Sequence, residues 1–426
     1  TLVPPTGLVT ETPAFARSGL PALSSLVFGG HDTMECPLPK RAEHLAAGGV
    51  LPHGLPTAVH AELAAADAEI RTGGPLPGDS RTDDELITAF AEEIRDFTHR
   101  HRLARVVVIN VASTEPAVVP GAPAVGATGV GSASAGSSSD SGLGSRSSLG
   151  SDSGSGSGLR SGSGLRSGSG VGDAASASAG STPTTPEPGP GSSASAPASA
   201  EPPPSSADRL PPSSLYAAAA LRAGAPYVNF TPSTGLHHPA LAALAAASGL
   251  PFAGRDGKTG QTLLRSVLGP MFAQRALAVR AWSGTNLLGG GDGAALADPA
   301  AAAAKNAGKE RVLADTLGTV PEGEVHIDDV PALGDWKTAW DHIAFDGFLG
   351  TRMTLQTTWQ GCDSALAAPQ ILDLARLLAR AHEAGLDGPR PELAFYFKDP
   401  DPGASSALPD QHLALLAFAD RLRETT

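Results

Sequence analysis

The sequence predicts an α/β fold, in which helices cover both faces of a parallel β-sheet and an α+β domain is inserted into the first domain. Three observations support this prediction. Short strand patterns alternate with helical patterns up to about residue 254, as in βαβ units. Beyond residue 260 strand and helix patterns are mixed, and one strand pattern alternates with period two. Two helical patterns close the chain, and we expect them to return to the first domain.

The elements of the first half are short and have turn-forming residues at their boundaries. In chain order we expect a strand at 25–32, a helix at 83–101, a strand at 105–111, a helix at 215–222, a strand at 227–230, a helix at 239–247 and an extended segment at 251–254. The run at 105–111 is almost entirely β-branched, which is typical of a strand covered on both faces. A serine is expected to cap the helix that begins at residue 215. Because ligands bind at the carboxyl edge of such sheets, the polar strand endings His31-Asp32, Ser113-Thr114 and Thr231 mark the expected crevice.

The elements of the second half are expected to form the inserted domain and the returning helices. They are an amphipathic helix at 261–277, strands at 325–328 and 353–359, and helices at 367–384 and 412–423. In the second strand Met353, Leu355, Thr357 and Trp359 share one face.

A low-complexity segment interrupts the first domain between residues 117 and 208. It consists almost wholly of Ser, Gly, Ala and Pro and has almost no large apolar residues. Such a composition cannot bury enough surface to offset the entropy of ordering, so it predicts a disordered insertion. Gly-x-Gly spacings inside it, such as Gly129 and Gly131, lack a preceding strand and a following helix and predict no nucleotide loop. About 330 residues remain for globular structure.

Charge and composition exclude several classes of function. The net charge of −13 and the pI near 5.3 argue against a nucleic-acid partner. No apolar run is of membrane-spanning length, and the first residues lack the features of a signal peptide, so we expect a soluble cytoplasmic protein. Cys36 and Cys362 have no motif spacing and predict neither a disulfide framework nor a zinc site.

Lysine is rare, and its distribution is informative. Six lysines occur among 426 residues, against twenty-four arginines. Five of them stand in short polar motifs with neighbouring Asp, Thr or Gly, namely Lys258, Lys305, Lys309, Lys337 and Lys398. An ammonium is compact and can lose its proton when buried, which a guanidinium cannot do. Clustered lysines are more often a solvated face than a site, but the motifs around these five favour a site.

Six motifs share this polar character. They are Asp256–Thr262 (DGKTGQT), Asn286–Gly293 (NLLGGGDG), Lys305–Lys309 (KNAGK), Gly334–Lys337 (GDWK), Cys362–Pro369 (CDSALAAP) and Phe397–Pro400 (FKDP). In this order and at these spacings the chain resembles myo-inositol-1-phosphate synthases of the eukaryote-type long form. The resemblance extends upstream through VFGGHD, RVVVINVASTE and SSLYAAAALRAGAPYVNFTP. Each motif alone is weak, but six in order are specific.

The resemblance implies a Rossmann-like fold and a particular reaction. The family converts D-glucose 6-phosphate to 1D-myo-inositol 3-phosphate with bound NAD, through oxidation at C5, enolisation, aldol cyclisation and reduction. This reaction belongs to myo-inositol and phospholipid biosynthesis. The resemblance also implies a homotetramer formed through the inserted domain. The implied domains are a Rossmann-like NAD-binding domain at 1–116 and 209–260, the insertion at 117–208, an α+β catalytic and tetramerisation domain at 261–365, and C-terminal helices at 366–426.

The resemblance implies the following site positions, with no metal ligand among them. The catalytic positions are Lys305, Lys337, Lys309, Lys398, Asp292, Asp363 and Asn286. The cofactor-binding positions are Asp32, Ala112, Ser113, Thr114, Thr231, Asp256, Thr259, Gly290, Gly291, Asp292, Asp335, Asp363 and Ser364. Lys305 and Lys337 match lysines at the reacting oxygens, where an ammonium can stabilise an enolate or alkoxide and transfer a proton. Lys309 and Lys398 match lysines at the substrate phosphate and chain end.

Two of these motifs also have simpler explanations. Lys305 and Lys309 could be an i,i+4 pair on an exposed helix face, but like charges at that spacing repel, so a shared anion is the better interpretation. The segment from Asp335 to Lys337 could be a surface turn with a local ion pair.

Departures from the family pattern leave alternative functions open. Gly290 and Gly291 stand where the family commonly has two asparagines, the 304–309 segment differs, and Cys362 replaces a usual glutamate. The family opens with a βα unit whose glycine-rich turn holds the NAD pyrophosphate, and no such motif occurs here, so we expect that unit to be missing from the sequence. A sheet without that strand would expose edges, which places folding itself in question. The first alternative is therefore an inactive paralogue or fragment that binds a sugar phosphate, and a weaker one treats 117–208 as an interaction tether.

Overall fold

The computed structural model describes residues 6–33, 36–76, 79–112, 115, 209–289 and 310–425. All of them belong to one compact unit formed by Thr1–Pro123 and Ser205–Thr426.

The predicted parallel sheet is present. It has four short strands, β3 (Val108–Asn110), β4 (Tyr227–Asn229), β5 (Pro251–Gly254) and β10 (Gly388–Pro389), in the order β10-β5-β4-β3. All neighbouring strands are parallel. The strand expected at 105–111 is therefore confirmed at its centre, although only three of its residues pair.

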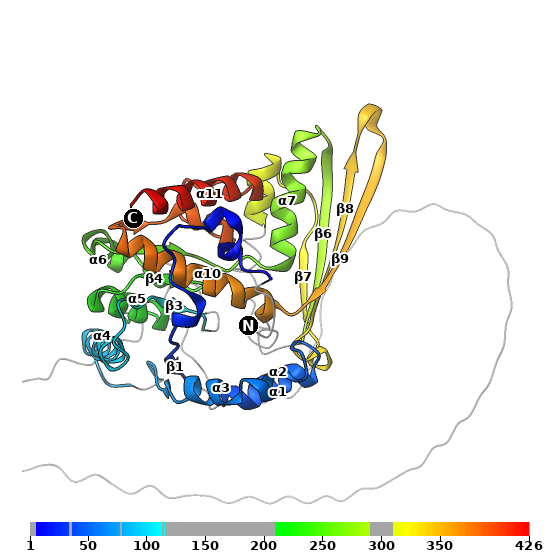
Figure 1. Cartoon of the computed structure of the whole chain (residues 1–426). Coiled ribbons are helices and arrows are strands. Elements are labelled where there is room, and N and C mark those ends of the chain that lie inside the picture. The colour runs from blue at the N-terminus through cyan, green and yellow to red at the C-terminus, as the bar shows by residue number, and fades with distance from the viewer. Residues whose placement is uncertain are drawn as a thin grey trace, which may run out of the picture. The chain divides into compact units, whose positions relative to one another are not determined.

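Helices cover this sheet on both faces (Figure 1). On one face α4 (Asp83–Arg100) and α5 (Pro212–Ala223) pack with Tyr227. On the other face α10 (Asp363–Glu383) and α11 (Leu408–Glu424) pack with Val228. Consecutive residues of a strand point to opposite faces, so one strand serves both cores.

The strand expected at 25–32 is only partly correct. It forms β1 (Gly30–Asp32), which pairs in parallel with β2 (Ile70–Thr72) in a separate two-stranded sheet. Val27 and Phe28 are 44% and 54% exposed, so the apolar run is not the buried strand that its composition indicated. Within the described residues β1 has one neighbouring strand, and a two-stranded sheet does not cover both faces of the segment that leads into it.

A second sheet, of mixed topology, contains longer strands. Its order is β7-β6-β8-β9, with β7 (Val325–Asp329), β6 (Ala278–Leu288), β8 (Lys337–Asp346) and β9 (Arg352–Gly361). Strands β6 and β7 are parallel, and the other two pairs are antiparallel. Helix α7 (Gly260–Gln274) lies beside this sheet (Figure 1) and contributes Phe272 to a core with Trp282 and Ile343. The alternation predicted around Leu355 is confirmed, but β6 and β8 were not predicted.

Several short elements connect these parts. The helices not predicted from the sequence are α1 (Leu38–Ala47), α2 (Leu55–Ala58) and α3 (His60–Asp67), whereas α6 (Ala242–Ala247) lies in the helical segment expected at 239–247. The 3-10 helices are η1 (Val9–Glu11), η2 (Pro13–Phe15), η3 (Leu23–Ser25), η4 (Gly235–His237), η5 (Pro239–Leu241), η6 (Pro331–Leu333), η7 (Phe348–Gly350) and η8 (Pro391–Tyr396). No helix in the described part of the chain is both long and apolar enough to cross a membrane.

The expected serine cap of α5 is wrong. The helix begins at Pro212 and has no side-chain cap from its N-cap residue. Instead, the Glu115 carboxylate accepts hydrogen bonds from the Ser213 backbone N–H (2.6 Å) and the Ser213 hydroxyl (2.5 Å). A carboxylate is favourable at a helix N-terminus, where backbone N–H groups are unpaired. Burial raises the pKa of the Glu115 carboxyl, and the bonds from Ser213 oppose this rise.

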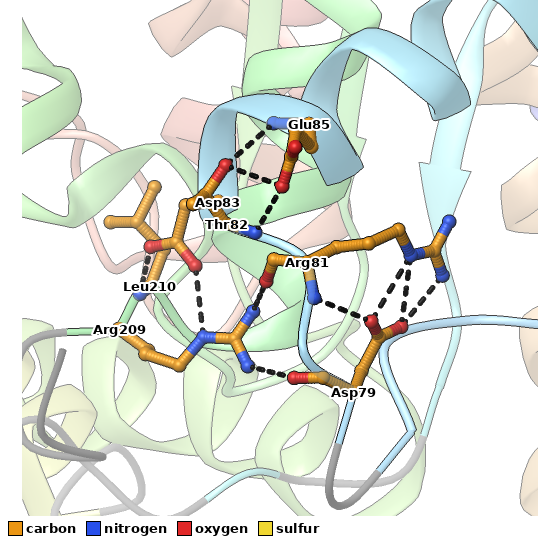
Figure 2. Close-up of polar contacts among 7 residues, drawn as sticks. All are labelled: Asp79, Arg81, Thr82, Asp83, Glu85, Arg209 and Leu210. Atoms are coloured by element: carbon orange, nitrogen blue, oxygen red, sulfur yellow. Dashed lines mark hydrogen bonds and ion pairs between the residues drawn. The ribbon is translucent and has the colours of Figure 1, made fainter. Parts of the chain in front are cut away.

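Residue 209 is anchored to the start of α4 (Figure 2). The Arg209 guanidinium donates to the backbone oxygens of Asp79 (2.9 Å) and Arg81 (2.5 Å) and pairs with Asp83 (3.2 Å). The next backbone N–H, of Leu210, donates to the second Asp83 oxygen at 2.7 Å. The two ends that flank residues 116–208 are thus both held on the folded unit.

Candidate functional site

The carboxyl edge of the parallel sheet carries a network of neutral polar groups. Asn110, which ends β3, donates to the Asn229 side-chain oxygen (3.2 Å) and to the Thr231 hydroxyl (3.1 Å). Asn229 in turn donates to the Ser233 carbonyl at 2.6 Å. Asn229 and Thr231 are buried, 2% and 7% exposed. This is the edge at which the sequence predicts a ligand crevice.

A short antiparallel pairing joins this edge to the chain near the C-terminus. The backbone of residues 255–258 exchanges hydrogen bonds with residues 396–399, and Gly257 bridges to Phe397. Gly257 is required by space, because a Cβ there would lie 2.2 Å from the Phe230 ring. Asp256 adopts a φ of 60°, a left-handed conformation that is uncommon for a residue other than glycine. The segment is therefore closely constrained.

This pairing places Lys398 against Asp256. The Lys398 Nζ lies 2.9 Å from an Asp256 carboxylate oxygen, and both side chains are about nine-tenths enclosed. Asp399 beside it pairs with Arg255 at 2.7 Å and also with Arg311. Arg311 donates to the Lys398 carbonyl at 2.6 Å, which fixes the backbone that carries the lysine. Buried ion pairs of this kind need such additional hydrogen bonds to offset desolvation.

A second lysine is held from the same segment. The Thr259 hydroxyl donates to one oxygen of Asp363 at 3.2 Å, and Lys337 Nζ donates to the other at 2.8 Å. Thr259 is the N-cap residue of α7, Lys337 begins β8 and Asp363 begins α10. Residues 256–259 therefore hold two lysines, one through Asp256 and one through Asp363.

A third lysine, Lys258, belongs to the segment 256–259 itself. Lys258 is 3% exposed, and among the described residues its ammonium donates to the Gln411 side-chain oxygen of α11. Its carbonyl accepts from Gln370 of α10 at 3.0 Å. Burial lowers the pKa of Lys258 to about 7. Desolvation disfavours the charged form of an amine, so this group can change charge near neutral pH.

A buried polar cluster extends from α7 into the mixed sheet. Gln261 donates to Asp341 of β8, and Asn286 of β6 donates to Gln261, each at 3.0 Å. Two side-chain oxygens here, Thr262 Oγ1 and Asn286 Oδ1, are buried and have no hydrogen-bond partner within the described residues. Buried polar atoms are normally paired, so each of these oxygens is a candidate contact for a ligand group.

The structure brings most of the described candidates together. Those that meet around residues 256–259 or in the adjoining polar networks are Thr231, Asp256, Thr259, Asn286, Lys337, Asp363 and Lys398. Ser364 follows Asp363 in the first turn of α10, and the Ala112 N–H donates to the Asn110 side chain. Asp335 instead pairs with Arg41 of α1, and Asp32 lies on β1 in the separate two-stranded sheet. The candidates outside the described residues are Ser113, Thr114, Gly290, Gly291, Asp292, Lys305 and Lys309.

Sequence reasoning missed the supporting residues. Asn110, Asn229 and Asp341 were not identified as part of the site, although each asparagine lies one residue before the end of a predicted strand. No local sequence pattern identified Asp341, because its strand was not predicted. Arg311 was also missed, since nothing in its local sequence links it to Asp399.

Neutral polar side chains line the described part of the sheet edge. No group of three or more His, Cys, Asp or Glu side chains in the described part could hold a metal ion. At the sheet edge Asn110, Asn229 and Thr231 offer amide and hydroxyl groups. The nicotinamide carboxamide and ribose hydroxyls of NAD have the complementary donors and acceptors, so this edge fits NAD.

Comparisons with known proteins agree on one family. The family model of myo-inositol-1-phosphate synthase matches residues 260–364. Inositol-3-phosphate synthase 1 of Bacteroides thetaiotaomicron is 36% identical over 205 residues, which are 46% of this chain and 48% of that protein. Inositol-3-phosphate synthase of Spirodela polyrhiza is 34% identical over 175 residues, 39% of this chain and 34% of that protein. The chain thus matches about half, or less, of the length of these curated relatives.

A solved structure shows the same fold. The crystal structure of inositol-3-phosphate synthase from Caenorhabditis elegans superposes with a TM-score of 0.65 and covers 95% of this chain and 72% of that one. The sequence identity is 20%, so this likeness concerns the fold alone.

Proposed function

The chain belongs to the myo-inositol-1-phosphate synthase family, and from this premise we propose that it catalyses the NAD-dependent conversion of D-glucose 6-phosphate to 1D-myo-inositol 3-phosphate. The observation that carries the proposal is the segment 256–259, which holds Lys398 through Asp256 and Lys337 through Asp363. Two enclosed ammonium groups on one constrained segment suit a substrate that is a phosphate ester and that develops negative charge on oxygen.

Each lysine has a distinct role in this proposal. Lys337 Nζ, held by Asp363, stabilises the enolate or alkoxide oxygen and can pass a proton to it from the ammonium. Lys398 Nζ, held by Asp256, lies at the phosphate end of the substrate. The two carboxylates hold the ammonium groups in place before substrate arrives. Enclosure strengthens the interaction of each ammonium with developing charge, because the local dielectric is low.

The start of α7 suits the substrate phosphate. A helix N-terminus presents unpaired backbone N–H groups and a favourable dipole to an anion. Helix α7 begins at Gly260, directly after Thr259, and Thr262 in its first turn has a buried hydroxyl without a partner in the described residues. A phosphate there would have Lys398 and this hydroxyl as candidate contacts.

NAD is the proposed cofactor and, when bound, supplies reversible hydride transfer. Asn110, Asn229 and Thr231 would hold it at the carboxyl edge of the parallel sheet, next to Asp256. These side chains are already ordered by their mutual hydrogen bonds, so they would orient the cofactor with little loss of side-chain entropy. Thr231 also accepts the Asp256 backbone N–H at 3.1 Å through its carbonyl, which links this edge to the lysine-bearing segment.

We also propose that the functional form is a homotetramer assembled through the mixed sheet. Phe348 and Leu349, in the connection between β8 and β9, are 86% and 88% exposed, and Trp340 is 37% exposed. Large apolar side chains that are this exposed favour a protein interface. Analytical ultracentrifugation of the wild-type chain and of a Phe348→Glu, Leu349→Glu variant tests this. A monomeric wild-type chain would contradict the tetramer.

The function is tested by an assay for inositol phosphate formation from glucose 6-phosphate with NAD. We expect product from the wild-type chain, and a loss of about 100-fold or more in kcat for Lys337→Met, the scale of losing one preorganised stabilising group. Lys398→Met should mainly raise KM, because it binds the phosphate. Lys40→Met, which removes an exposed lysine of α1, is the matched control. Binding of glucose 6-phosphate without any product, at saturating NAD, would contradict the proposal.

A further inference from the structure

Asp341 is an enclosed carboxylate at the centre of the mixed sheet. It lies on β8, is 2% exposed and faces α7. Three different side chains donate to it: Trp282 Nε1 at 2.8 Å, Arg265 Nη2 at 3.3 Å and Gln261 Nε2 at 3.0 Å. An ionised carboxylate accepts hydrogen bonds and cannot donate them. Every neighbour must therefore present a donor to Asp341.

This requirement fixes the orientation of the Gln261 amide. Its Nε2 donates to both Asp341 oxygens at 3.0 Å. The reverse orientation would place the Gln261 oxygen against two acceptors. Consequently Gln261 Oε1 points to Asn286, whose Nδ2 donates to it at 3.0 Å.

The same logic fixes the Asn286 amide. Because Nδ2 is directed to Gln261, Oδ1 is the group left over, and it has no hydrogen-bond partner among the described residues. Asn286 is 1% exposed, so water does not readily satisfy this oxygen. An unsatisfied buried acceptor destabilises the fold, and a ligand donor would remove that cost. We call the chain of hydrogen bonds from Asp341 through Gln261 to Asn286 the relay. Its free end is thus an acceptor and not a donor.

Gly284 makes room for this relay. It lies directly opposite Asp341 in the register of β6 and β8. A Cβ at this position would lie 2.7 Å from Gln261 Nε2 and 3.1 Å from an Asp341 oxygen. A larger residue would separate Gln261 from Asp341, so the hydrogen bond between them requires a glycine at position 284.

We propose that Asp341 is a positioning residue, which acts through Gln261 to present the Asn286 carbonyl oxygen to a hydroxyl group of the bound sugar phosphate. This inference rests on the proposed function for the identity of the ligand. The hydroxyl donates its proton to Asn286 Oδ1. Asp341 itself touches neither substrate nor cofactor.

A double-mutant cycle tests the direction of the relay without any ligand. Asp341→Asn alone allows the chain of amides to reverse, and Asn286→Asp alone places two acceptors at one junction. Combining the two changes restores a consistent chain in the opposite direction, because position 286 then carries an acceptor and position 341 carries a donor. We therefore expect each single variant to lower the urea midpoint of unfolding, and the double variant to be more stable than the sum of the two losses.

Ligand binding tests the functional half of the proposal. In Asp341→Asn the Asn286 amide can turn, so the sugar hydroxyl would meet an N–H and could no longer donate. We expect at least tenfold weaker binding of glucose 6-phosphate by calorimetry at saturating NAD, about one factor of ten for each 1.4 kcal/mol lost. The double variant, which has an acceptor at position 286, should partly recover this binding. Asp346→Asn is the matched control, because this change on the same strand breaks a pair with Arg280, which is 69% exposed. The control should bind like the wild type.

The outcomes separate the relay from the proposed function. Additive losses in the cycle, or unchanged binding in Asp341→Asn, would overturn the relay even if the wild type makes product. Energetic coupling together with no glucose 6-phosphate binding by the wild type would overturn the ligand assignment, while the hydrogen-bond direction would be supported. Coupling, weaker binding in the single variant and recovery in the double variant together support the proposal.

Discussion

The parallel sheet and the mixed sheet bury polar groups in different ways. At the edge of the parallel sheet Asn110, Asn229 and Thr231 satisfy one another through neutral hydrogen bonds. The mixed sheet instead encloses a full ion pair, Asp341 with Arg265, whose side chains are 3% and 1% exposed. A neutral hydrogen bond contributes about 1 kcal/mol, whereas an uncompensated buried charge costs several. Single polar changes should therefore be most damaging in the mixed sheet.

The largest effect is expected for Asp341→Ala. This change leaves the Arg265 guanidinium enclosed without its carboxylate and also removes the acceptor for Trp282 Nε1. Burial already lowers the pKa of Arg265, and the Asp341 charge opposes this. We expect a loss of about 3–5 kcal/mol in the free energy of unfolding, measured by urea denaturation.

A small loss of unfolding free energy in Asp341→Ala would contradict this expectation. Asp346→Ala on the same strand should cost less than about 1 kcal/mol, because its partner Arg280 is largely exposed. If Asp341→Ala cost no more than this control, the enclosed ion pair would not distinguish the mixed sheet.

The next effect concerns the segment that joins the two regions. In Gly257→Ala the new methyl group would lie 2.2 Å from the Phe230 ring, so either the ring or the segment must move. We expect a loss toward the upper end of about 1–3 kcal/mol in unfolding free energy. Because residue 257 lies between Asp256 and Thr259, both lysines should shift and kcat should fall as well. Gly73→Ala, where a Cβ meets open space, is the control and should change neither quantity.

A third prediction uses the pH dependence of stability. The pKa of Lys258 is about 7 in the folded chain against 10.5 for the ordinary amine, so the unfolded chain binds more protons between these values. This group therefore makes stability rise with pH, by about 2 kcal/mol between pH 7 and pH 9. Lys258→Met removes the titrating amine and should remove that rise. The test is the difference between the two unfolding curves across this window, and parallel curves would contradict it.

The sequence predicts the parallel sheet better than it predicts the mixed sheet. The helix at 83–101 and the strand at 227–230 were placed nearly correctly, because local periodicity and β-branched runs report burial directly. Strands β6 and β8 were missed, since Gly284, Asn286 and Asp341 occupy positions on their inward face where apolar residues are expected. Asn286 and Asp341 belong to the relay, so the apolar pattern failed at the residue to which we assign ligand binding and at the residue that positions it.

The candidate site divides in a similar way. Lysines and aspartates within motifs were identified because their residue types are chemically distinctive. Their partners Gln411 and Arg311 could not be, because these contacts depend on how distant elements pack. Asp335 pairs with Arg41 across almost 300 residues, a contact that no local pattern encodes.

The smallest effect is expected in the parallel-sheet region, for replacement of residues 117–208. The ends of this segment are held independently, by Glu115 on Ser213 and by Arg209 on Asp83. Glu115 contacts Ser213, which follows Arg209 by only four residues, so a linker of about eight residues, which reaches about 26 Å, can join the two ends. Replacing 117–208 by such a linker should change the unfolding free energy by no more than about 2 kcal/mol, and in the stabilising direction, because a shorter loop closes at a smaller entropic cost.

The same deletion also tests whether residues 117–208 affect catalysis. Since the insertion joins β3 to α5 and none of the residues to which we assign a role at the site lies within it, we expect kcat and KM to remain those of the full chain. Arg209→Ala in the shortened chain is the more sensitive test of the Arg209 anchor, because it removes that anchor while the loop is short. A large loss of stability on deletion alone would show that the segment contributes to the fold, and a change in KM alone would support the tether.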